Sequence, residues 1–597
     1  MKPENHSNAS LATRSIEDQL QRILASKAFT PSARMSRFLR FAVELTLRGE
    51  AEQLKEYVLG VEVFDRSPSY DPRVDPIVRV EARRLRSKLT SYYDGEGRGD
   101  ELIIDFPKGT YAPVFRQRSA THAAAPVQPP RTDAIAVLPF SNLSAEPDTE
   151  YFSDGLTEEL IHGLTKLDGL MVVAWSSAAR LKGQPYDIRE IGRQLNVCCV
   201  LVGSVRSSGE RLRVMVQLVD TSSGRYLWTE TYDRKIEDLF AIQEEISRAI
   251  VQTLQPRLVT PAIRHGEHSP ECLEAYNLYL KGRFQWNKRT AEGLKRSVQH
   301  FEQAIGLDPG FALGYAGLAD AYTLLADYGL VNSGDIMPAA KSAARKALEI
   351  DPTLAEAHTS LGLIRSIYDW EWAEAETHYR RAMELNPGYA TTHYWFAVDY
   401  LGTMGRTDEA FAEIELAQQL DPLSPIIREG KGYLLMLSRR YDEAIEEYRQ
   451  LLDLDCFFYK GFTSMGRAYA QKGMYEEAIT MLQKGRSLAG EIPSILGALG
   501  QTYALLRRPD DARRLLDELA ELAKRRHVSS TCFALIHLGL GEKERALEWL
   551  ETGLRGRETA LSALKAHPAY DGLRGEPRFH ALLQKLGLAS TAVSEAC

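Results

Sequence analysis

Residues 465–488 read MGRAYAQKGMYEEAITMLQKGRSL, and this stretch decides the architecture of more than half of the chain. The small residues Gly466 and Ala468 allow two helices to approach closely, and Gly473 falls where a turn is needed. Tyr475 and Ala478 then open a second segment whose apolar residues recur at helical spacing. The stretch therefore predicts a helix, a tight turn and a second helix packed on the first.

The same pattern recurs along the carboxy-terminal half of the chain. The segments EQAIGLDP, RKALEIDP, RRAMELNP, ELAQQLDP, RQLLDLDC and QKGRSLAG end at Pro309, Pro352, Pro387, Pro422, Cys456 and Gly490. Successive ends are 43, 35, 35, 34 and 34 residues apart, and the first interval holds the insertion ADYGLVNSGDI. The prolines stop one helix and reset the chain for the next unit.

A period near 34 residues with two helices per unit resembles the tetratricopeptide repeat. The resemblance implies an all-α solenoid over residues 271–590, built from about seven or eight units. The last segment, HPAYDGLRGEPRFHALLQKLGL, is expected to cap it. Stacked helix pairs form a concave face that typically binds a protein or peptide, here of unknown identity. The alternative is a spacer or a platform for self-association.

The middle region, residues 133–258, alternates between strand and helix patterns. Strands are expected at DAIAVLPF, LMVVAW, CCVLVGSVR, RLRVMVQLVD and RYLWTETYD, and helices at SDGLTEELIHGLTKL, DIREIGRQLN and LFAIQEEISRAIVQTL. Ser153 or Asp154 is the expected cap of the first of these helices. The pattern predicts an α/β domain with a mixed sheet. Its sequence resembles the TolB-amino-terminal-like domain, related to the FlgO and CsgG group, which implies an accessory role and no activity.

The amino-terminal region, residues 14–118, contains the basic segment RVEARRLRSKL at 79–89. On a helix over residues 74–93, an apolar stripe faces the core; it consists of Val78, Ala82, Leu85, Leu89 and Tyr92. Cations lie on both sides of that stripe: Arg79, Arg83 and Arg86 on one flank, Arg84 and Lys88 on the other. A charged helix face of this kind is either solvated or placed against a phosphate backbone.

The residues around this helix favour the second alternative. Two helices are expected before it, at MSRFLRFAVELTLRG and LKEYVLGVEVFD, and the segment ELIIDFPKGTYAPVF after it predicts a hairpin that turns at Gly109. A basic helix followed by a hairpin is the layout of a winged helix (α+β). The region resembles the carboxy-terminal winged-helix domain of OmpR- and PhoB-type regulators, through the tail Arg84–Leu89 and the pair Gly109 and Tyr111.

That resemblance implies binding to duplex DNA. The residues expected to neutralise phosphates or reach base edges are Arg79, Arg83, Arg84, Arg86 and Lys88, with Lys108 and Thr110 of the hairpin on the neighbouring backbone. One such domain offers few contacts, so specific binding is expected to use a homodimer or tandem sites. The segment SYDPRVDPI before the helix is longer than the family pattern, and this leaves the set of base-contacting residues open.

Composition limits the remaining functions. The net charge of −8 over 597 residues means that any contact with nucleic acid is local. Six cysteines without a CxxC pair fit a reducing compartment. The first residues lack a secretory signal, and no run of 18 apolar residues occurs, so a cytoplasmic protein without a membrane span is expected. The segment 119–132, rich in Ala and Pro, is expected to be a linker.

The sequence carries no catalytic signature. The HExxH, GxxxxGK[ST], GxSxG and kinase patterns are absent from the sequence, and we expect no catalytic residue, cofactor or metal. The middle region and the repeats together also resemble the tails of some proteins called adenylate cyclases, so such a label is expected by similarity alone. The prediction is a multidomain, bacterial-type transcriptional regulator that binds DNA and carries a protein-binding tail. The alternative is a non-enzymatic scaffold whose amino-terminal domain binds protein.

Overall fold

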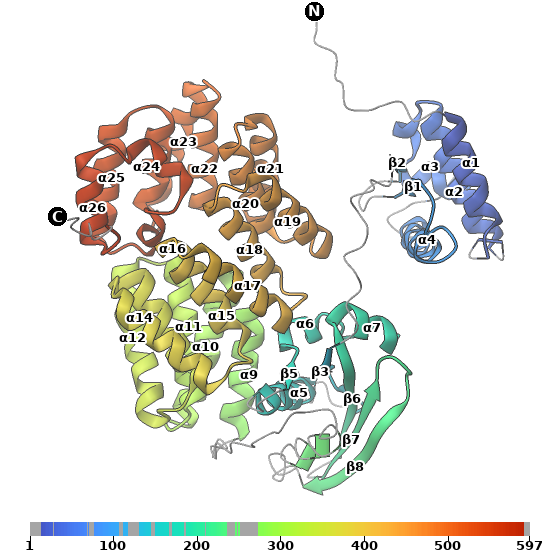
Figure 1. The fold of residues 1–597 in the computed structure, drawn as a ribbon, viewed down its shortest axis with the longest axis horizontal. Coiled ribbons are helices and arrows are strands. Elements are labelled where there is room, and N and C mark those ends of the chain that lie inside the picture. The colour runs from blue at the N-terminus through green and yellow to red at the C-terminus, as the bar shows by residue number, and fades with distance from the viewer. Residues whose placement is uncertain are drawn as a thin grey trace, which may run out of the picture. The chain divides into compact units, whose positions relative to one another are not determined.

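The computed structural model forms two compact units, Met1–Gln128 and Pro129–Cys597. It describes residues 13–27, 29–30, 32–67, 70, 77–106, 111–117, 131–144, 150–165, 170–183, 187–208, 211–235, 245–246, 249–250, 253 and 273–589. Each unit is considered by itself below (Figure 1).

The first unit consists of helices followed by a hairpin. Its elements are α1(Thr13–Ala25), α2(Ala33–Leu47), the 3₁₀ turn η1(Ala51–Gln53), α3(Glu56–Glu62), α4(Ile77–Asp94), β1(Leu102–Asp105) and β2(Val114–Gln117). The two strands are antiparallel, with Leu102 opposite Gln117 and Asp105 opposite Val114. Helices α2, α3 and α4 match the three expected helices, and α1 is a further helix that no prediction named. The elements of the winged-helix layout are therefore present, while membership of that fold class stays a prediction.

The apolar stripe of α4 is buried as expected. Its five residues, Val78, Ala82, Leu85, Leu89 and Tyr92, are at most 4% exposed. They join a core in which the Phe38 ring meets the rings of Phe64 and Phe106 edge to face. Burial of this stripe fixes the rotation of α4 about its axis, because a side chain of this size stabilises the fold by roughly 1.5–3 kcal/mol when fully buried. Arg84, which lies between stripe positions, is left exposed on a flank.

The second unit begins with an α/β domain. Its described elements are β3(Arg131–Val137), β4(Ser141–Asn142), α5(Glu150–Thr165), β5(Met171–Val172), α6(Trp175–Ala179), α7(Ile188–Leu195), β6(Val197–Ser208), β7(Arg211–Asp220) and β8(Tyr226–Lys235). The strand order is β5-β3-β6-β7-β8, with β4 beside β6. Pairs of β3 with β5 and β6 are parallel, while β6, β7 and β8 run antiparallel. The predicted mixed sheet is confirmed. The helix expected over 239–254 is described only at 245–246, 249–250 and 253, which are helical.

Two local predictions in this domain are wrong. The strand expected over 170–175 is only two residues long, because the N–H of Ala174 donates to the carbonyl of Leu420 in the repeats at 2.8 Å and the chain leaves the sheet. Helix α5 begins at Glu150, so Ser153 and Asp154 lie inside the helix and do not cap it. The Asp154 carboxylate instead pairs with the Lys182 ammonium at 2.7 Å.

Helix pairs make up the rest of the unit, in agreement with the predicted solenoid. The first four pairs are α9(Leu273–Asn287) with α10(Ala291–Leu307), α11(Ala312–Asp327) with α12(Ser333–Ile350), α13(Ala355–Ile364) and the π-helix η5(Arg365–Asp369) with α14(Trp372–Leu385), and α15(Ala390–Trp395), the π-helix η6(Phe396–Leu401) and α16(Gly402–Met404) with α17(Thr407–Leu420). The next four are α18(Pro425–Leu437) with α19(Tyr441–Leu454), α20(Tyr459–Gln471) with α21(Tyr475–Ala489), α22(Pro493–Leu505) with α23(Pro509–Ala523), and α24(Ser530–Gly539) with α25(Lys543–Arg555). The first helices of successive pairs pack on one another, so they line the inner side of the curved array (Figure 1).

The turn inside each pair needs a left-handed residue. Gly473, predicted to lie at such a turn, has φ 84°, and Gly405 and Gly541 occupy the corresponding place in other pairs. Arginine takes this place at Arg289 and Arg507, with φ of 54° and 60°. A residue with a Cβ atom is less favourable there than glycine by about 1–2 kcal/mol.

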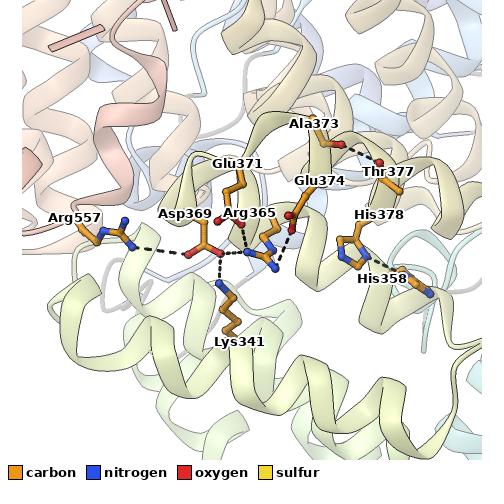
Figure 2. A network of polar contacts seen from close by, with 10 residues as sticks. All are labelled: Lys341, His358, Arg365, Asp369, Glu371, Ala373, Glu374, Thr377, His378 and Arg557. Atoms are coloured by element: carbon orange, nitrogen blue, oxygen red, sulfur yellow. Dashed lines mark hydrogen bonds and ion pairs between the residues drawn. The ribbon is translucent and has the colours of Figure 1, made fainter. Parts of the chain in front are cut away.

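The carboxy-terminal segment folds back on the middle of the array. It contains η7(Thr559–Ala563), η8(Pro568–Leu573) and α26(Pro577–Lys585). The Trp372 indole N–H donates to the carbonyl of Leu586 at 2.7 Å, and Arg439 pairs with Asp571 at 2.8 Å. Figure 2 shows a third link, in which Arg557 approaches Asp369 at 4.0 Å beside Arg365 and Lys341. The segment thus closes the array onto the third and fifth pairs, and its role as a cap stays a prediction.

Candidate functional site

Among the α4 cations whose side chains the structure describes, Arg84 is the exposed one. Its side chain is 67% exposed, and its Nη1 lies 2.8 Å from the Glu81 carboxylate, which is itself buried. The guanidinium has five N–H donors and only one is used in this pair, so Arg84 can contact a phosphate with the others while the pair with Glu81 stays in place.

Two other predicted DNA-contacting residues, Arg86 and Lys88, make contacts within the domain itself. The Arg86 Nε donates to the carbonyl of Phe106 at 2.8 Å, which ties α4 to the end of β1. The Lys88 ammonium lies 5.7 Å from the centre of the Phe29 ring. The structure places Arg79 and Arg83 on α4 between Val78 and Leu85, whereas Lys108 and Thr110 lie outside the described residues. The structure thus brings the five cations of α4 onto one helix, and the predicted contacts at the hairpin tip stay predictions.

Hydrogen bonds tie α4 and the hairpin to each other and to α1 and α3. The backbone N–H of Ile104 donates to the Tyr93 hydroxyl at 2.7 Å, and the Tyr111 hydroxyl donates to Glu56 of α3 at 2.6 Å. The Asp100 carboxylate, just before β1, accepts from Tyr92 at 2.7 Å and from Gln19 of α1 at 2.6 Å. A basic helix fixed in this way presents its charges without further ordering, which favours binding to a regular polyanion.

A second surface joins the α/β domain to the repeats. Three residues at the same place in successive repeats take part: Asn386, Asp421 and Asp455, here called the loop row. Asn386 donates to the Thr165 hydroxyl of α5 at 3.4 Å, Asp421 accepts from the hydroxyls of Ser176 and Ser177 of α6, and Asp455 pairs with Arg180 at 3.4 Å. The domain thus docks along three consecutive repeat loops.

The loop row has a local origin. At this position of the repeat loops the side-chain oxygen closes a local turn by accepting the N–H two residues later, as in Asp308 with Gly310 at 2.9 Å and Asp351 with Thr353 at 2.8 Å. Two members of the loop row keep this turn while they dock: Asn386 with Gly388 at 3.2 Å and Asp455 with Phe457 at 3.1 Å. Burial raises the pKa of Asp421, against the serine hydrogen bonds that lower it. An isolated repeat would show only the turn, so nothing local in the sequence pointed to the docking role.

A cavity of about 450 Å³ opens beside the loop row, and α5, α6, α9, α13, α15 and α18 contribute to its lining. Trp286 lies in its wall, and two guanidinium groups lie over its ring, those of Arg283 at 4.5 Å and Arg289 at 3.6 Å from the ring centre. No prediction named this cavity, because its walls come from residues more than 250 positions apart in the chain.

Other kinds of site find no support among the described residues. There is no cluster of three or more His, Cys, Asp or Glu side chains placed to hold a metal ion. The cysteines that the structure describes, Cys198, Cys199, Cys456 and Cys532, are all free of disulfides. In the same part of the chain, no helix combines the length and the apolar character needed to cross a bilayer.

Comparison with known families assigns the middle and last parts of the chain. Residues 131–249 match the family model of the second domain of HilA/YgeH-like transcriptional regulators. Residues 429–455 and 459–489 match the tetratricopeptide repeat. The chain therefore carries a HilA-like regulator domain followed by tetratricopeptide repeats, and the predicted repeat family is confirmed. The resemblance of the middle region to TolB-amino-terminal-like domains stays a prediction.

The relatives include both kinds of protein that the sequence resembled, one called an adenylate cyclase and one called a transcriptional regulator. The chain is 35% identical over 268 residues to a Rhizobium meliloti protein named "Putative adenylate cyclase 3", covering 43% of this chain and 44% of that protein. It is 24% identical over 327 residues to the transcriptional regulator HilA of Salmonella typhimurium, covering 54% and 56%. The chain thus spans about half the length of these relatives. Among solved structures, PilF of Pseudomonas aeruginosa is 24% identical, with a TM-score of 0.27 over 36% of this chain and 95% of that one.

Proposed function

We propose that the chain is a DNA-binding transcriptional regulator whose first unit binds duplex DNA through α4. The observation that carries the proposal is the order of parts along the chain. A unit of three helices, a basic helix and a hairpin is followed by the HilA-like domain at 131–249. The relative named HilA is itself a transcriptional regulator. In this proposal Arg79, Arg83 and Arg84 contact phosphates or base edges, Arg86 and Lys88 hold α4 in place, and Lys108 and Thr110 flank the groove.

The repeats supply the interaction half of the function. Tetratricopeptide arrays bind proteins or peptides, and the inner side of the array is the face that we assign to an unidentified protein partner. A regulator of this kind works in the cytoplasm without a catalytic step, and the name of the Rhizobium relative gives this chain no cyclase activity. Dimerisation would give a pair of α4 helices two half-sites on the duplex.

A salt titration tests DNA binding. The full chain is titrated with a fluorescent 30-base-pair duplex of random sequence, between about 50 and 200 mM salt. We expect affinity to fall steeply with salt, because each neutralised phosphate contributes about −0.9 to the slope of log K against log salt. The variant Arg83→Ala/Arg84→Ala should bind more weakly and show a slope smaller by about 2.

The control removes the same charge elsewhere. Arg514 and Arg545 are exposed on second helices of the repeats, and Arg514→Ala/Arg545→Ala should leave the slope unchanged. Failure of the folded chain to bind duplex at 50 mM salt would refute the proposal. The amino-terminal unit would then be a protein-binding domain of a signalling scaffold.

A further inference from the structure

We propose that β8 is the surface through which two copies of this chain pair, edge to edge, as an antiparallel dimer. The dimer surface rests on the proposed function only for its consequence at DNA. Strand β8 ends the strand order β5-β3-β6-β7-β8 of the α/β domain (Figure 1). It pairs with β7 along one side. No described strand pairs with its other side.

The open edge of β8 is long and lacks the features that normally protect such an edge. A free strand edge carries unpaired N–H and C=O groups, and natural proteins shield it with proline, with a bulge or by keeping the strand short. Strand β8 has ten residues and no proline, and its one irregularity against β7 lies near its start. The strand at the opposite edge, β5, has only two residues. The sheet is therefore short on one edge and open on the other.

The side chains of β8 also suit pairing with another strand. Tyrosine, tryptophan and threonine favour strands, and they make up most of YLWTETYDRK at 226–235. Tyr226 is 64% exposed and Leu227 is 37% exposed, so apolar surface lies at the start of this edge. An edge strand that is long, exposed and partly apolar is a template for a second chain.

Symmetry restricts the register of such a pair. In a two-fold dimer the strands run antiparallel and each side chain faces one from the same side of the sheet, so the centre falls on a residue. A centre at Glu230 would place two carboxylates opposite each other, and a centre at Thr231 would pair no opposite charges. A centre at Tyr232 places Glu230 of each copy opposite Arg234 of the other. The strand is complementary to itself in that register, because it forms two cross-strand ion pairs.

Glu230 and Arg234 are available for these pairs. Both are exposed, and Glu230 makes no ion pair in the described part of the chain. Arg234 lies 3.8 Å from Glu245, a long pair that leaves other N–H groups of the guanidinium for a second carboxylate. Asp233 projects from the other face of the sheet, where it pairs with Arg211 at 2.7 Å. It therefore does not compete with Glu230 for the arginine of the second copy.

The size of the contact sets the expected affinity. One strand pair is a small interface, and contacts below about 1,200 Å² are usually weak. We expect a dissociation constant of roughly 1–100 µM and exchange of subunits between dimers. A dimer carries two copies of α4, which is the number that two half-sites on a duplex require.

Sedimentation velocity of the full chain, without DNA, tests the proposal from about 1 to 200 µM. The wild type should shift from the monomer mass of 67.0 kDa toward twice that mass as the concentration rises. Glu230→Arg places cations opposite each other in the dimer, and Arg234→Glu places carboxylates opposite each other. Each variant should weaken self-association about tenfold or more.

An equimolar mixture of the two variants gives the sharpest readout. In the mixed dimer each altered position faces a residue of opposite charge, so the mixture should associate as the wild type does. A merely structural defect in either variant would not be repaired by mixing. Arg206→Glu makes the same change of charge on β6, a strand that is paired along both sides, and should associate as the wild type does.

Three results would overturn the proposal. The first is a wild type that stays monomeric at the highest concentration, as expected if another segment of this chain or a peptide of another protein covers the edge. The second is a dimer that both charge reversals leave intact, and the third is a mixture of the folded variants that stays monomeric. None of these readouts involves DNA. A dimeric chain that does not bind duplex would contradict the DNA-binding proposal alone.

Discussion

At the scale of single residues, two histidines face each other so closely that only one of their facing ring nitrogens can carry a proton. His358 and His378 face each other with their Nδ1 atoms 3.0 Å apart (Figure 2). Burial, aided by the charge of His358, lowers the pKa of His378 to about 4. In the unfolded chain the pKa of a histidine is about 6.5. The unfolded state therefore binds the proton first, and the stability from the neutral ring is complete above pH 6.5 and is lost as pH falls toward 4.

The variant His378→Gln should reduce this acid sensitivity. We expect the loss of unfolding free energy between pH 7 and pH 5 to shrink by about 1 kcal/mol, measured by urea denaturation at both values. His580→Gln changes an exposed histidine and serves as the control. Identical pH dependence in wild type and His378→Gln would contradict the assignment.

Also at this scale, Asp421 should hold the α/β domain on the repeats. In Asp421→Ala the two serine hydroxyls of α6 lose their acceptor, so we expect faster deuterium uptake over residues 174–180 and a loss of about 1–3 kcal/mol in unfolding free energy. Asp351→Ala removes the same repeat position where it closes only a local turn. Equal uptake over α6 in the two variants would show that Asp421 has no special part in docking.

At the scale of elements, the close contact of paired helices depends on glycine. A Cβ atom on Gly466 would lie 2.7 Å from Leu482 Cγ and 3.0 Å from the carbonyl of Ala478, in the facing helix. Gly466→Ala should therefore destabilise the chain by about 1–3 kcal/mol, although alanine is the better helix former. Gly306 lies in α10 with open space around it, and Gly306→Ala should stabilise by up to about 1 kcal/mol. Urea denaturation measures both, and a stabilised Gly466→Ala would contradict the close-approach argument.

Elements whose pattern is local were predictable. The stripe of α4, the turn at Gly473 and the three antiparallel strands follow from short-range spacing, and the structure has them. The prediction failed at 170–175, where an apolar run leaves the sheet because Ala174 bonds to Leu420, a residue 246 positions away. The cavity and the loop row escaped prediction for the same reason, since each depends on docking between distant segments. For the DNA contacts, the sequence pattern predicted the cations of α4. It could not distinguish Arg84, which is exposed, from Arg86, which donates a hydrogen bond to the carbonyl of Phe106.

At the scale of the whole second unit, the carboxy-terminal segment closes the array. Its apolar side chains are buried in the core that also holds the first four pairs; they include Leu561, Leu564, Leu573, Phe579 and Leu586. A chain ending at Arg555 should expose their partners, lose more than about 5 kcal/mol of stability and associate in solution. Urea denaturation and light scattering check this. Trp372→Phe, which loses only the bond to Leu586, should cost about 1 kcal/mol. A truncated chain as stable as the full one would show that the closure is incidental.

The loop row has a consequence for how such a chain can change over generations. Its members are 35 and 34 residues apart, so gaining or losing one repeat between them would place a different loop opposite α6. The carboxy-terminal segment reaches back to Trp372, so the number of repeats between Trp372 and that segment is also fixed. Duplication of a unit lengthens an open solenoid without penalty, whereas here it would break one contact or the other. The number of repeats is thus set by geometry at both ends, and new specificity must come from substitutions within the existing units.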